Sequence, residues 1–460
     1  MKKRVSSIML MFVFLITTKT FATHMLSGEI QFTHISGYTY QVEIITYTKI
    51  SSPADRPELE INWGDGSSDT IPRTNGNGIP VATDVKKNIY SSNHTYPGPS
   101  DYFIQFTDQN RDAGIINITN SVNAPFSTQA LLQIGSVFTN QHSARFLEMP
   151  DLSASLNTTN TYNVNAYDPD GDCLSYELVP CGGGGVYTYP NASNSFTIDS
   201  INGEIKWDAP ISIGDYAIAV KVKEWRNGIN IGYVIRDFNI LVLPTPIPST
   251  VFAGTNVWQV NANGNYSYTL AATDTLQLNL SYTDNTASAI DLNAYGETFL
   301  LNDTSHFTKS LTPSTINGSF EWTPGSVNVR SAPYVVTFRG ISTNSPYQIN
   351  NDVSLLIYVL DANTTPCFYP TSIKEPEAIN TITISPNPST GTFIFSYHPV
   401  SPKTFFKMMD AMGRMVYTQT LTSVDGKEKI NATGLSNGVY YYELVGDDKV
   451  MRAGKVFIVH

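Results

Sequence analysis

Short runs of alternating apolar and polar residues recur along the chain and limit what it can fold into. Residues 38–44, 216–222 and 334–338 carry aromatic or aliphatic side chains at every second position. Alternation with a period of two buries one face of a β-strand and leaves the other in water. Glycine, proline, asparagine and aspartate separate the runs about every ten residues, and no sustained helical period is present. The pattern therefore predicts an all-β chain built from antiparallel β-sandwiches.

The composition excludes two broad classes of protein. Charged residues make up 15% of the 460 residues, against a usual share of roughly 25%, and 41% are hydrophobic. A chain this apolar is not expected to be disordered. The formal net charge is −11, and basic residues cluster only at positions 2–4. Because binding to a phosphate backbone depends on lysine and arginine, we expect no nucleic-acid partner.

The first 22 residues have the pattern of a secretory signal peptide. Basic residues at 2–4 precede an apolar run at 8–16, and the small residue Ala22 follows where a signal peptidase would cut. A transmembrane helix needs about 20 apolar residues, and no later segment is long and apolar enough either. We therefore predict a signal peptide at 1–22, no transmembrane segment, and a secreted or cell-surface protein.

The three cysteines of the chain leave at least one thiol unpaired. Cys173 and Cys181 bracket residues 174–179, which we expect to form a strand. An extended chain of this length holds its ends roughly 26 Å apart, whereas a disulfide tolerates about 7 Å between α-carbons. These two cysteines are therefore not expected to bond to each other, and we expect apolar cores rather than disulfides to hold the protein together.

A short segment of sequence occurs twice. INGEIKW at 201–207 recurs as INGSFEW at 316–322. Asn-Gly between alternating residues favours a tight two-residue hairpin turn, since both central positions need positive φ. The tryptophan that ends each copy is expected to fill a sandwich core. The repeat therefore predicts two related sandwich domains.

Proline-bearing stretches near 244–248 and within 363–380 suggest connectors between domains. The predicted order begins with the signal peptide and continues with three sandwiches, a linker and a terminal domain. Their predicted bounds are 23–148, 149–245 and 246–362 for the sandwiches, 363–380 for the linker and 381–460 for the terminal domain.

Four motifs follow one another in the terminal domain: ISPNPSTGTF at 384–393, DAMGRMV at 410–416, LSNGVYY at 435–441 and KVFIV at 455–459. In this order they resemble the type A C-terminal sorting domain of the type IX secretion system of Gram-negative bacteria. The resemblance implies a small β-sandwich that engages the secretion machinery, after which the passenger is attached to surface polysaccharide or released. The residues of the sorting motif are Asp410, Gly413, Arg414, Gly438 and Tyr440.

The sequence also predicts a core for this terminal domain. The residues expected to line it are Phe405, Met408, Met415, Val439 and Tyr441. An ordinary fourth sandwich without a sorting role would have the same physical pattern, so only the resemblance separates the two interpretations.

Two segments of the first sandwich resemble the signatures of a polycystic-kidney-disease (PKD) type repeat, an immunoglobulin-like sandwich. They are NWGDGS at 62–67 and HTYPGPSDY at 94–102. The resemblance implies a PKD-like domain, with Trp63 and Tyr102 as plausible core aromatics. The stretch between the signatures, 68–93, is long for that family, which leaves an elaborated domain open.

The second sandwich carries DPDGDCLSYEL at 168–178, which is similar to cadherin-like and putative-Ig repeats of bacterial surface proteins. Some of those repeats use such aspartates to bind calcium. Asp168, Asp170 and Asp172 could present three carboxylates to this cation, which prefers oxygen ligands. A type I turn with Pro169 at its second position explains the same residues, and both interpretations stay open.

No catalytic pattern is present in the sequence: it has no His-Glu-x-x-His pair, no Gly-x-Ser-x-Gly turn and no zinc-ligand spacing. We therefore predict a non-enzymatic, exported protein with an adhesive or structural role and a glycan or protein ligand outside the cell. One alternative is a carbohydrate-binding accessory protein of a polymer-degrading system, using Tyr187, Tyr189, Trp225 or Trp258. The other is a hydrolase, which convergent carboxylates with shifted pKa values in a cleft would favour.

Overall fold

The computed structural model divides the chain into two compact units, Met1–Tyr369 and Pro370–His460, called here unit 1 and unit 2. The predicted signal peptide at 1–22 and most of the predicted linker at 363–380 lie outside the described residues. The structure describes residues 25–135, 139–244, 251–254, 258–312, 314–344, 347–367, 383–396, 404–410, 414–421, 426–446 and 449–460.

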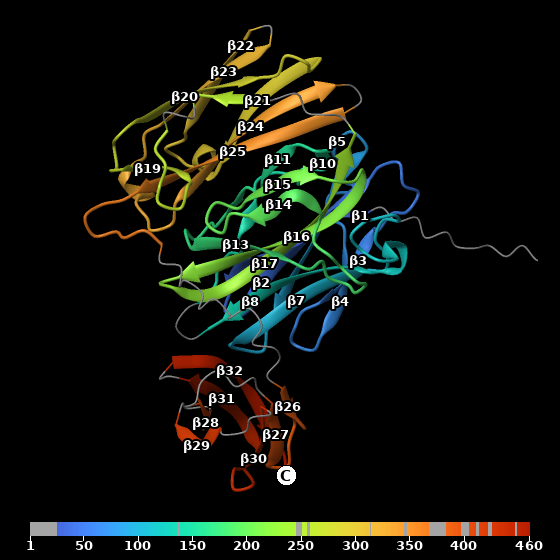
Figure 1. Ribbon diagram of the computed structural model, residues 1–460, viewed down its shortest axis with the longest axis vertical. Coiled ribbons are helices and arrows are strands. Elements are labelled where there is room, and N and C mark those ends of the chain that lie inside the picture. The colour runs from blue at the N-terminus through green and yellow to red at the C-terminus, as the bar shows by residue number, and fades with distance from the viewer. Residues whose placement is uncertain are drawn as a thin grey trace, which may run out of the picture. The chain divides into compact units, whose positions relative to one another are not determined.

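The predicted all-β class is confirmed: the described residues contain strands and three short 3₁₀ turns, and no α-helix (Figure 1). The first part of unit 1 contains β1 (Met25–Ser36), β2 (Thr39–Lys49), β3 (Glu58–Asn62), β4 (Ser68–Pro72), β5 (Ile79–Ala82), β6 (Val85–Thr95), β7 (Ser100–Asp108), η1 (Ser121–Asn123) and β8 (Phe126–Ile134). The second part contains β9 (Arg145–Phe146), β10 (Ser153–Ser155), β11 (Thr159–Asn163), β12 (Ala166–Tyr167), β13 (Cys173–Val179), β14 (Ala192–Ile198), β15 (Glu204–Pro210), β16 (Gly214–Arg226) and β17 (Ile229–Leu243).

The third part of unit 1 and unit 2 complete the fold. The third part contains β18 (Val251–Ala253), β19 (Tyr266–Leu270), β20 (Leu276–Thr283), β21 (Ala289–Gly296), η3 (Glu297–Phe299), β22 (His306–Thr312), β23 (Thr315–Trp322), η4 (Ser326–Asn328), β24 (Tyr334–Asn344) and β25 (Tyr347–Val359). Unit 2 contains β26 (Thr383–Ser385), β27 (Thr392–Ser396), β28 (Thr404–Met409), β29 (Met415–Leu421), β30 (Lys427–Asn431), β31 (Gly438–Gly446) and β32 (Lys449–Ile458).

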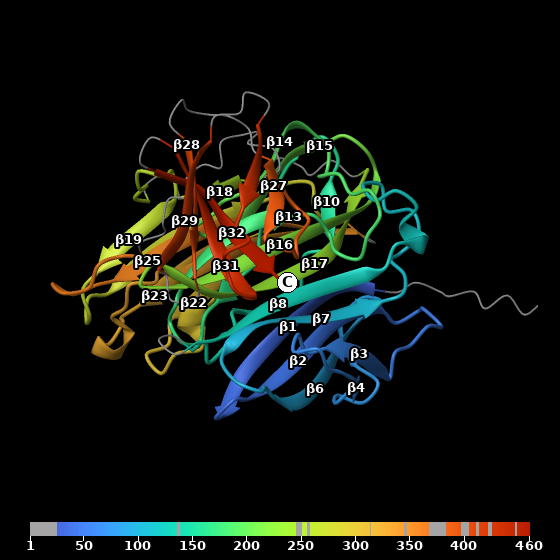
Figure 2. The ribbon, with the colours of Figure 1, turned by 90° about the horizontal axis from the view of Figure 1, so that it is seen from below.

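The first two parts of unit 1 share a single 12-stranded sheet (Figures 1 and 2). Along one edge β17 pairs with β16 over nearly its whole length. Along its other edge β17 meets β8, β1 and β10 in succession. The boundary predicted at 148/149 therefore does not separate two sheets, because hydrogen bonds run across it from strands of both parts.

Apolar side chains on the shared sheet form a continuous core. The alternating residues of β2, β16 and β24 that the sequence singled out are buried, except Tyr38, which precedes β2 and is 43% exposed. Trp63 and Tyr102 are buried in the core of the first part, as expected. Trp207 and Trp322, the two repeated tryptophans, are 2% and 1% exposed, so each fills a core as predicted.

The Asn-Gly hairpin prediction is wrong in both copies of the repeat. Asn317 and Gly318 lie inside β23, where they pair with β20 and β22 rather than turning the chain. Asn202 and Gly203 belong to a longer loop between β14 and β15, and only the glycine has a positive φ, of 77°. Pairing on both sides of β23 overrides the local turn preference of Asn-Gly.

The third part is a sandwich of two four-stranded sheets, β18-β20-β23-β22 and β19-β25-β24-β21. Its strand β25 packs on β11 of the second part. There the Asp352 carboxylate accepts a hydrogen bond from the Asn163 amide nitrogen at 2.8 Å and pairs with the buried Arg339 guanidinium at 2.7 Å. The Ser354 hydroxyl donates to the Glu204 carboxylate at 2.6 Å. Buried polar contacts therefore join the second and third parts.

The sequence missed a long-range disulfide. Cys173 bonds to Cys367, 194 residues further along the chain, with 5.9 Å between their α-carbons. The prediction that Cys173 and Cys181 do not bond to each other is confirmed, and Cys181 is a buried free thiol. The expectation that disulfides play no part needs correction, because this bond fastens the last described residues of unit 1 to the second part.

Unit 2 is a small sandwich of the sheets β26-β27-β30 and β29-β28-β31-β32. Its core uses Phe406, Met408, Tyr440 and Tyr442. Of the predicted core residues, Met408 is buried and Phe405 is only partly buried. Met415, Val439 and Tyr441 are 61%, 39% and 41% exposed. The prediction was wrong by one residue on β31, because three consecutive tyrosines at 440–442 hide which face is apolar.

Two fully buried ion pairs cross the junction between the first and second parts. The Arg236 guanidinium on β17 binds the Glu29 carboxylate on β1 and stacks on the Phe146 ring at 3.8 Å. The adjacent Asp237 carboxylate binds Arg111 at 2.8 Å. Removal of one partner would leave a charge buried without compensation.

We predict that Arg236→Ala lowers the free energy of unfolding by about 3–5 kcal/mol, because Glu29 loses its buried counter-charge. Denaturation followed by tryptophan fluorescence measures this change, and all five tryptophans lie in unit 1. The control is Lys223→Ala, which removes a partly exposed pair with Glu177 and should cost no more than about 1 kcal/mol. Equal losses in the two variants would contradict the prediction.

Candidate functional site

The loop that joins β12 to β13 brings the three predicted aspartates together. One carboxylate oxygen from each of Asp168, Asp170 and Asp172 lies within 4.8 Å of the others. Asp168 Oδ1 accepts hydrogen bonds from the backbone amides of Asp170 at 2.8 Å and Asp172 at 3.1 Å. The Gly171 amide donates to the Asp168 carbonyl, which closes the turn. The first aspartate therefore holds the loop in shape.

The other two aspartates are already bound to an arginine and a histidine side chain. Asp172 receives Nε and Nη2 of Arg226 at 2.8 and 2.6 Å, a two-point contact. Asp170 Oδ1 contacts His142 Nδ1 at 2.6 Å, and its Oδ2 accepts the His142 amide at 3.1 Å. Every carboxylate oxygen of Asp170 and Asp172 therefore has a donor within the protein.

A fourth carboxyl, Glu224 on β16, lies beneath the loop and is fully buried. It accepts hydrogen bonds from the Ala144 amide and, at 2.6 Å, from the Asn140 side chain. Gly232 faces it on β17, where a Cβ atom would stand only 2.7 Å from the Glu224 carboxylate. The glycine therefore leaves the space that this buried carboxyl occupies.

Asp168 and Glu224 form a coupled pair of buried carboxyls. Burial, with a further contribution from Asp172, raises the pKa of Asp168 to about 7. Burial and the nearby Asp168 raise the pKa of Glu224 well above its usual value. Asp168 Oδ2 has no hydrogen-bond partner within the protein. Both buried carboxyls therefore keep their protons to a higher pH than exposed carboxyls do.

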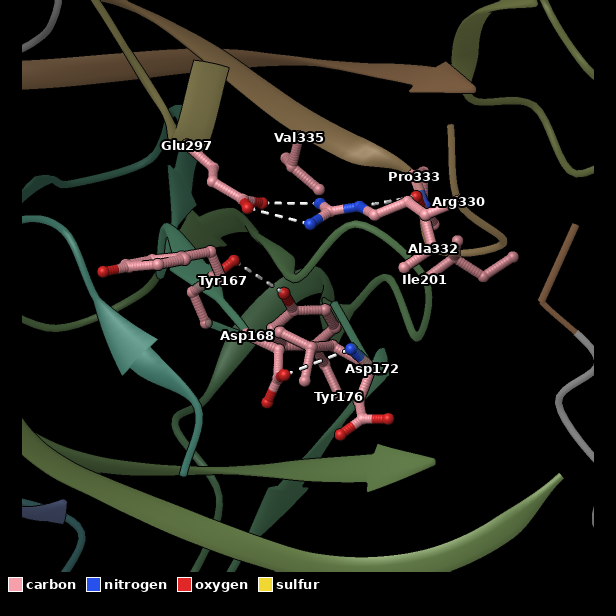
Figure 3. Close-up of a pocket in the computed structure, with 12 residues that line it drawn as sticks. Tyr167, Asp168, Asp172, Tyr176, Ile201, Glu297, Arg330, Ala332, Pro333 and Val335 are labelled. Atoms are coloured by element: carbon pink, nitrogen blue, oxygen red, sulfur yellow. Dashed lines mark hydrogen bonds and ion pairs between the residues drawn. The ribbon is translucent and has the colours of Figure 1, made fainter. Parts of the chain in front are cut away.

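The cavity lined by Asp168, Glu297 and Arg330 is too small for an organic substrate. Figure 3 shows its lining, in which Glu297 and Arg330 pair above and the Asp168 and Asp172 carboxylates point away from them. The Arg330–Glu297 contact is 2.8 Å. The cavity volume is about 20 Å³, which is room for about one water molecule. The loop is therefore a packed junction between the second and third parts.

These residues do not fit a calcium ion in this arrangement. Calcium takes six to eight oxygen ligands, and here only Asp168 Oδ2 lacks a protein donor. The Arg226 guanidinium sits on Asp172 and also lies 3.5 Å from Asp170, so it occupies the place of a cation. A cation would have to displace it and His142. The contacts favour the structural turn over the calcium site.

We predict that titrating the chain with calcium up to millimolar concentration gives no binding heat and no change in melting temperature, because Arg226 already neutralises the loop. Isothermal calorimetry and tryptophan fluorescence measure the two effects. Arg226→Gln, which frees Asp172, is the comparison variant. Saturable heat in the unmodified chain that disappears in Asp168→Asn would contradict the prediction and restore the calcium interpretation.

Four buried carboxyls have raised pKa values in the folded protein. Burial raises those of Asp151 to about 6 and of Asp168 and Glu204 to about 7, and it raises that of Glu224 well above its usual value. Between about pH 5 and 7 these four groups bind more protons in the folded state than in the unfolded state, so their contribution to stability falls as the pH rises.

We predict that the melting temperature of unit 1 is higher at pH 5 than at pH 8, since these carboxyls must ionise while buried. Asp168→Asn should reduce the difference between the two pH values, because asparagine does not titrate. Tryptophan fluorescence during heating at both pH values measures the effect. A melting temperature that increases from pH 5 to pH 8, in either chain, would contradict the assignment.

The predicted sorting residues lie in two places in unit 2. Asp410 accepts hydrogen bonds from the Arg414 amide at 3.0 Å and from its Nε at 2.8 Å, so the two residues bind to each other between β28 and β29. Gly438 begins β31, and Tyr440 is buried, with its hydroxyl donating to the Ser436 carbonyl. Gly413 lies outside the described residues. The described residues of the motif therefore shape the fold, and their part in sorting stays a prediction.

The four aromatic residues suggested for sugar stacking do not form a platform. Trp258 is buried in the core of the third part, and Trp225 donates its Nε1 to the Ser175 hydroxyl. The Tyr187 and Tyr189 rings are nearly perpendicular, at 83°. The arrangement of these four rings therefore does not support a glycan site based on stacking.

Sequence reasoning missed Glu224, Arg226 and His142, which decide the chemistry of the aspartate loop. Glu224 and Arg226 lie two positions apart in strand β16, and a glutamate at an otherwise apolar strand position was the available signal. His142 lies 28 residues from Asp170, and nothing in the sequence connects them.

No helix among the described residues is long and apolar enough to cross a membrane. No curated protein matches the chain.

Solved structures that match the chain are tandem immunoglobulin-domain proteins and an adhesin, at low similarity. A chimeric titin Z1Z2 tandem is 9% identical over 47% of this chain and 100% of its own, with a TM-score of 0.17. The titin fragment I67–I69 is 8% identical over 73% of this chain and 99% of its own, with a TM-score of 0.16. The sialic acid binding region of a Streptococcus sanguinis adhesin is 12% identical over 62% and 97%, with a TM-score of 0.17. TM-scores this low carry no conclusion about function.

The terminal motifs have a direct counterpart. Residues 383–459 match the family model described as the secretion system C-terminal sorting domain. This match covers the small sandwich of unit 2. It confirms the sorting-domain resemblance that the order of the motifs indicated: unit 2 is similar to the C-terminal sorting domains of a secretion system.

Proposed function

We propose that the chain is a non-enzymatic binding protein, exported by the type IX route and held on or released from the cell surface, with unit 1 as the adhesive passenger. The observation that carries the proposal is the sorting-domain match of residues 383–459 behind a large all-β unit. The PKD-like and cadherin-like characters of the first two parts belong to the same proposal. Attachment to surface polysaccharide or release is the expected fate of unit 1.

The contacts within unit 1 support a passenger that survives outside the cell. A disulfide fixes its last described residues, and buried ion pairs and a shared sheet join its parts. Disulfides persist in oxidising, extracellular surroundings. These features favour a rigid β unit that presents surfaces rather than one that encloses a substrate.

The hydrolase alternative calls for convergent carboxylates with shifted pKa values in a cleft, and only part of this arrangement is present. Asp168 and Glu224 are convergent carboxyls with raised pKa values. The cavity beside them, however, has room for about one water molecule, and Glu224 is fully buried. Glu58 and Glu60, two further carboxylates at alternate positions of strand β3, are exposed. We therefore propose no catalytic residue.

We predict that deleting residues 383–460 leaves unit 1 in the periplasm, because the sorting signal is removed while the signal peptide remains. Protease accessibility on whole cells and immunoblots of culture fractions measure the location. A matched test fuses residues 370–460 to a periplasmic reporter, which should then leave the cell, whereas Tyr440→Ala in that fusion should block export by emptying the core of unit 2. Unchanged surface exposure of the truncated chain would refute the sorting role.

A further inference from the structure

A shallow groove crosses the outer face of the sheet β18-β20-β23-β22 in the third part. Its volume is about 510 Å³, within the range of ligand sites and about twenty-five times that of the cavity lined by Asp168, Glu297 and Arg330. Ala253 and Gly254 line the end at β18, and residues from the other three strands form the floor. Most of the residues that line the groove carry polar side chains.

Strand register places the side chains of the floor in two cross-strand rows. Asn279, Ser319 and Thr308 face one another across β20, β23 and β22. Ser281, Asn317 and Ser310 form the next row. Side chains directly opposite on neighbouring strands are about 5 Å apart, so the six make a continuous field of hydroxyl and amide groups.

None of these six side chains makes a hydrogen bond to another described residue. Hydroxyl and amide groups each donate and accept. One end of the same face differs, since Thr283 and Thr315 bond to each other at 2.8 Å. The groove therefore offers donors and acceptors that are not used within the protein, whereas the hydroxyls of Thr283 and Thr315 are already hydrogen-bonded to each other.

The groove also lacks free charge. Lys309 is its only charged lining residue, and its Nζ is bound to Asp291 and, at 2.9 Å, to Asn293 on β21. Other outer faces of unit 1 differ: on β13 and β16, Glu177 pairs with Lys221 and Lys223 at 3.3 and 2.8 Å. A neutral field of this kind gives no counter-charge to an anionic ligand, whose desolvation would then cost free energy.

We propose that this groove binds an uncharged saccharide chain. A neutral sugar carries hydroxyl groups that both donate and accept, which matches the six floor side chains, and it needs no counter-charge. Since no aromatic side chain lines the groove, recognition rests on hydrogen bonds, and such sites discriminate against ligands that lack the matching hydroxyls. The inference rests on the proposed binding function of unit 1 and names its ligand class.

The test uses the full mature chain on an array of neutral and anionic saccharides, followed by calorimetry with the neutral oligosaccharide that binds best. Asn279→Ala combined with Asn317→Ala should weaken that binding at least tenfold, because it removes one amide from each row. Gln277→Ala is the matched control: it lies on the same face of β20, outside the groove, and should change affinity less than twofold.

A second variant protects against loss of folding. Asn317→Arg fills the exposed groove with a long cation and should abolish binding while the melting temperature stays within a few degrees. Three results would overturn the inference: no neutral saccharide binds, anionic saccharides bind preferentially, or binding survives both groove variants. If the groove fails in any of these ways while the truncated chain still stays in the periplasm, the proposed export stands without it.

Discussion

Strand β17 is the element on which the architecture of unit 1 depends. Its fifteen residues pair along one edge with β16 and along the other with β8, β1 and β10 in turn. A strand has two hydrogen-bonding edges. One edge of β17 pairs with β16, and β8, β1 and β10 each pair with a different stretch of the other edge. Because β17 pairs with strands of both parts, the first and second parts are not independent domains. The ion pairs of Arg236 and Asp237 are therefore buried in a core that both parts share.

That fusion explains why the aspartate loop is structural. The strands β16 and β17 bring Glu224 and Arg226 under the loop, and the Cys173–Cys367 bond ties the loop to the end of unit 1. Carboxylates that could have met a cation instead meet a guanidinium, an imidazole and backbone amides. A loop whose oxygens are satisfied from within stabilises a junction and has little affinity left for an external ion.

The predictable part of this fold is the part that local sequence controls. Period-two alternation correctly predicted the strands of β2, β16 and β24 and the core roles of Trp207 and Trp322, because burial of one face follows from the pattern itself. Partners distant in the sequence were not predictable: Cys367 and His142 have no local signal. On β31 the three tyrosines at 440–442 are apolar on both faces, so register there depended on pairing with β28 and β32.

Two sets of polar side chains in unit 1 differ in how far their hydrogen bonds are satisfied within the protein. Around Asp168 the buried side chains are ionisable and nearly all hydrogen-bonded, which fixes one arrangement and leaves a cavity with room for about one water molecule. On β20, β22 and β23 the groups are neutral and unpaired, and the groove is open. Affinity for a new partner comes from groups that exchange water for ligand, because satisfied groups must first break protein contacts. The physical balance therefore favours the neutral sheet face, and not the acidic loop, as the binding surface of the passenger.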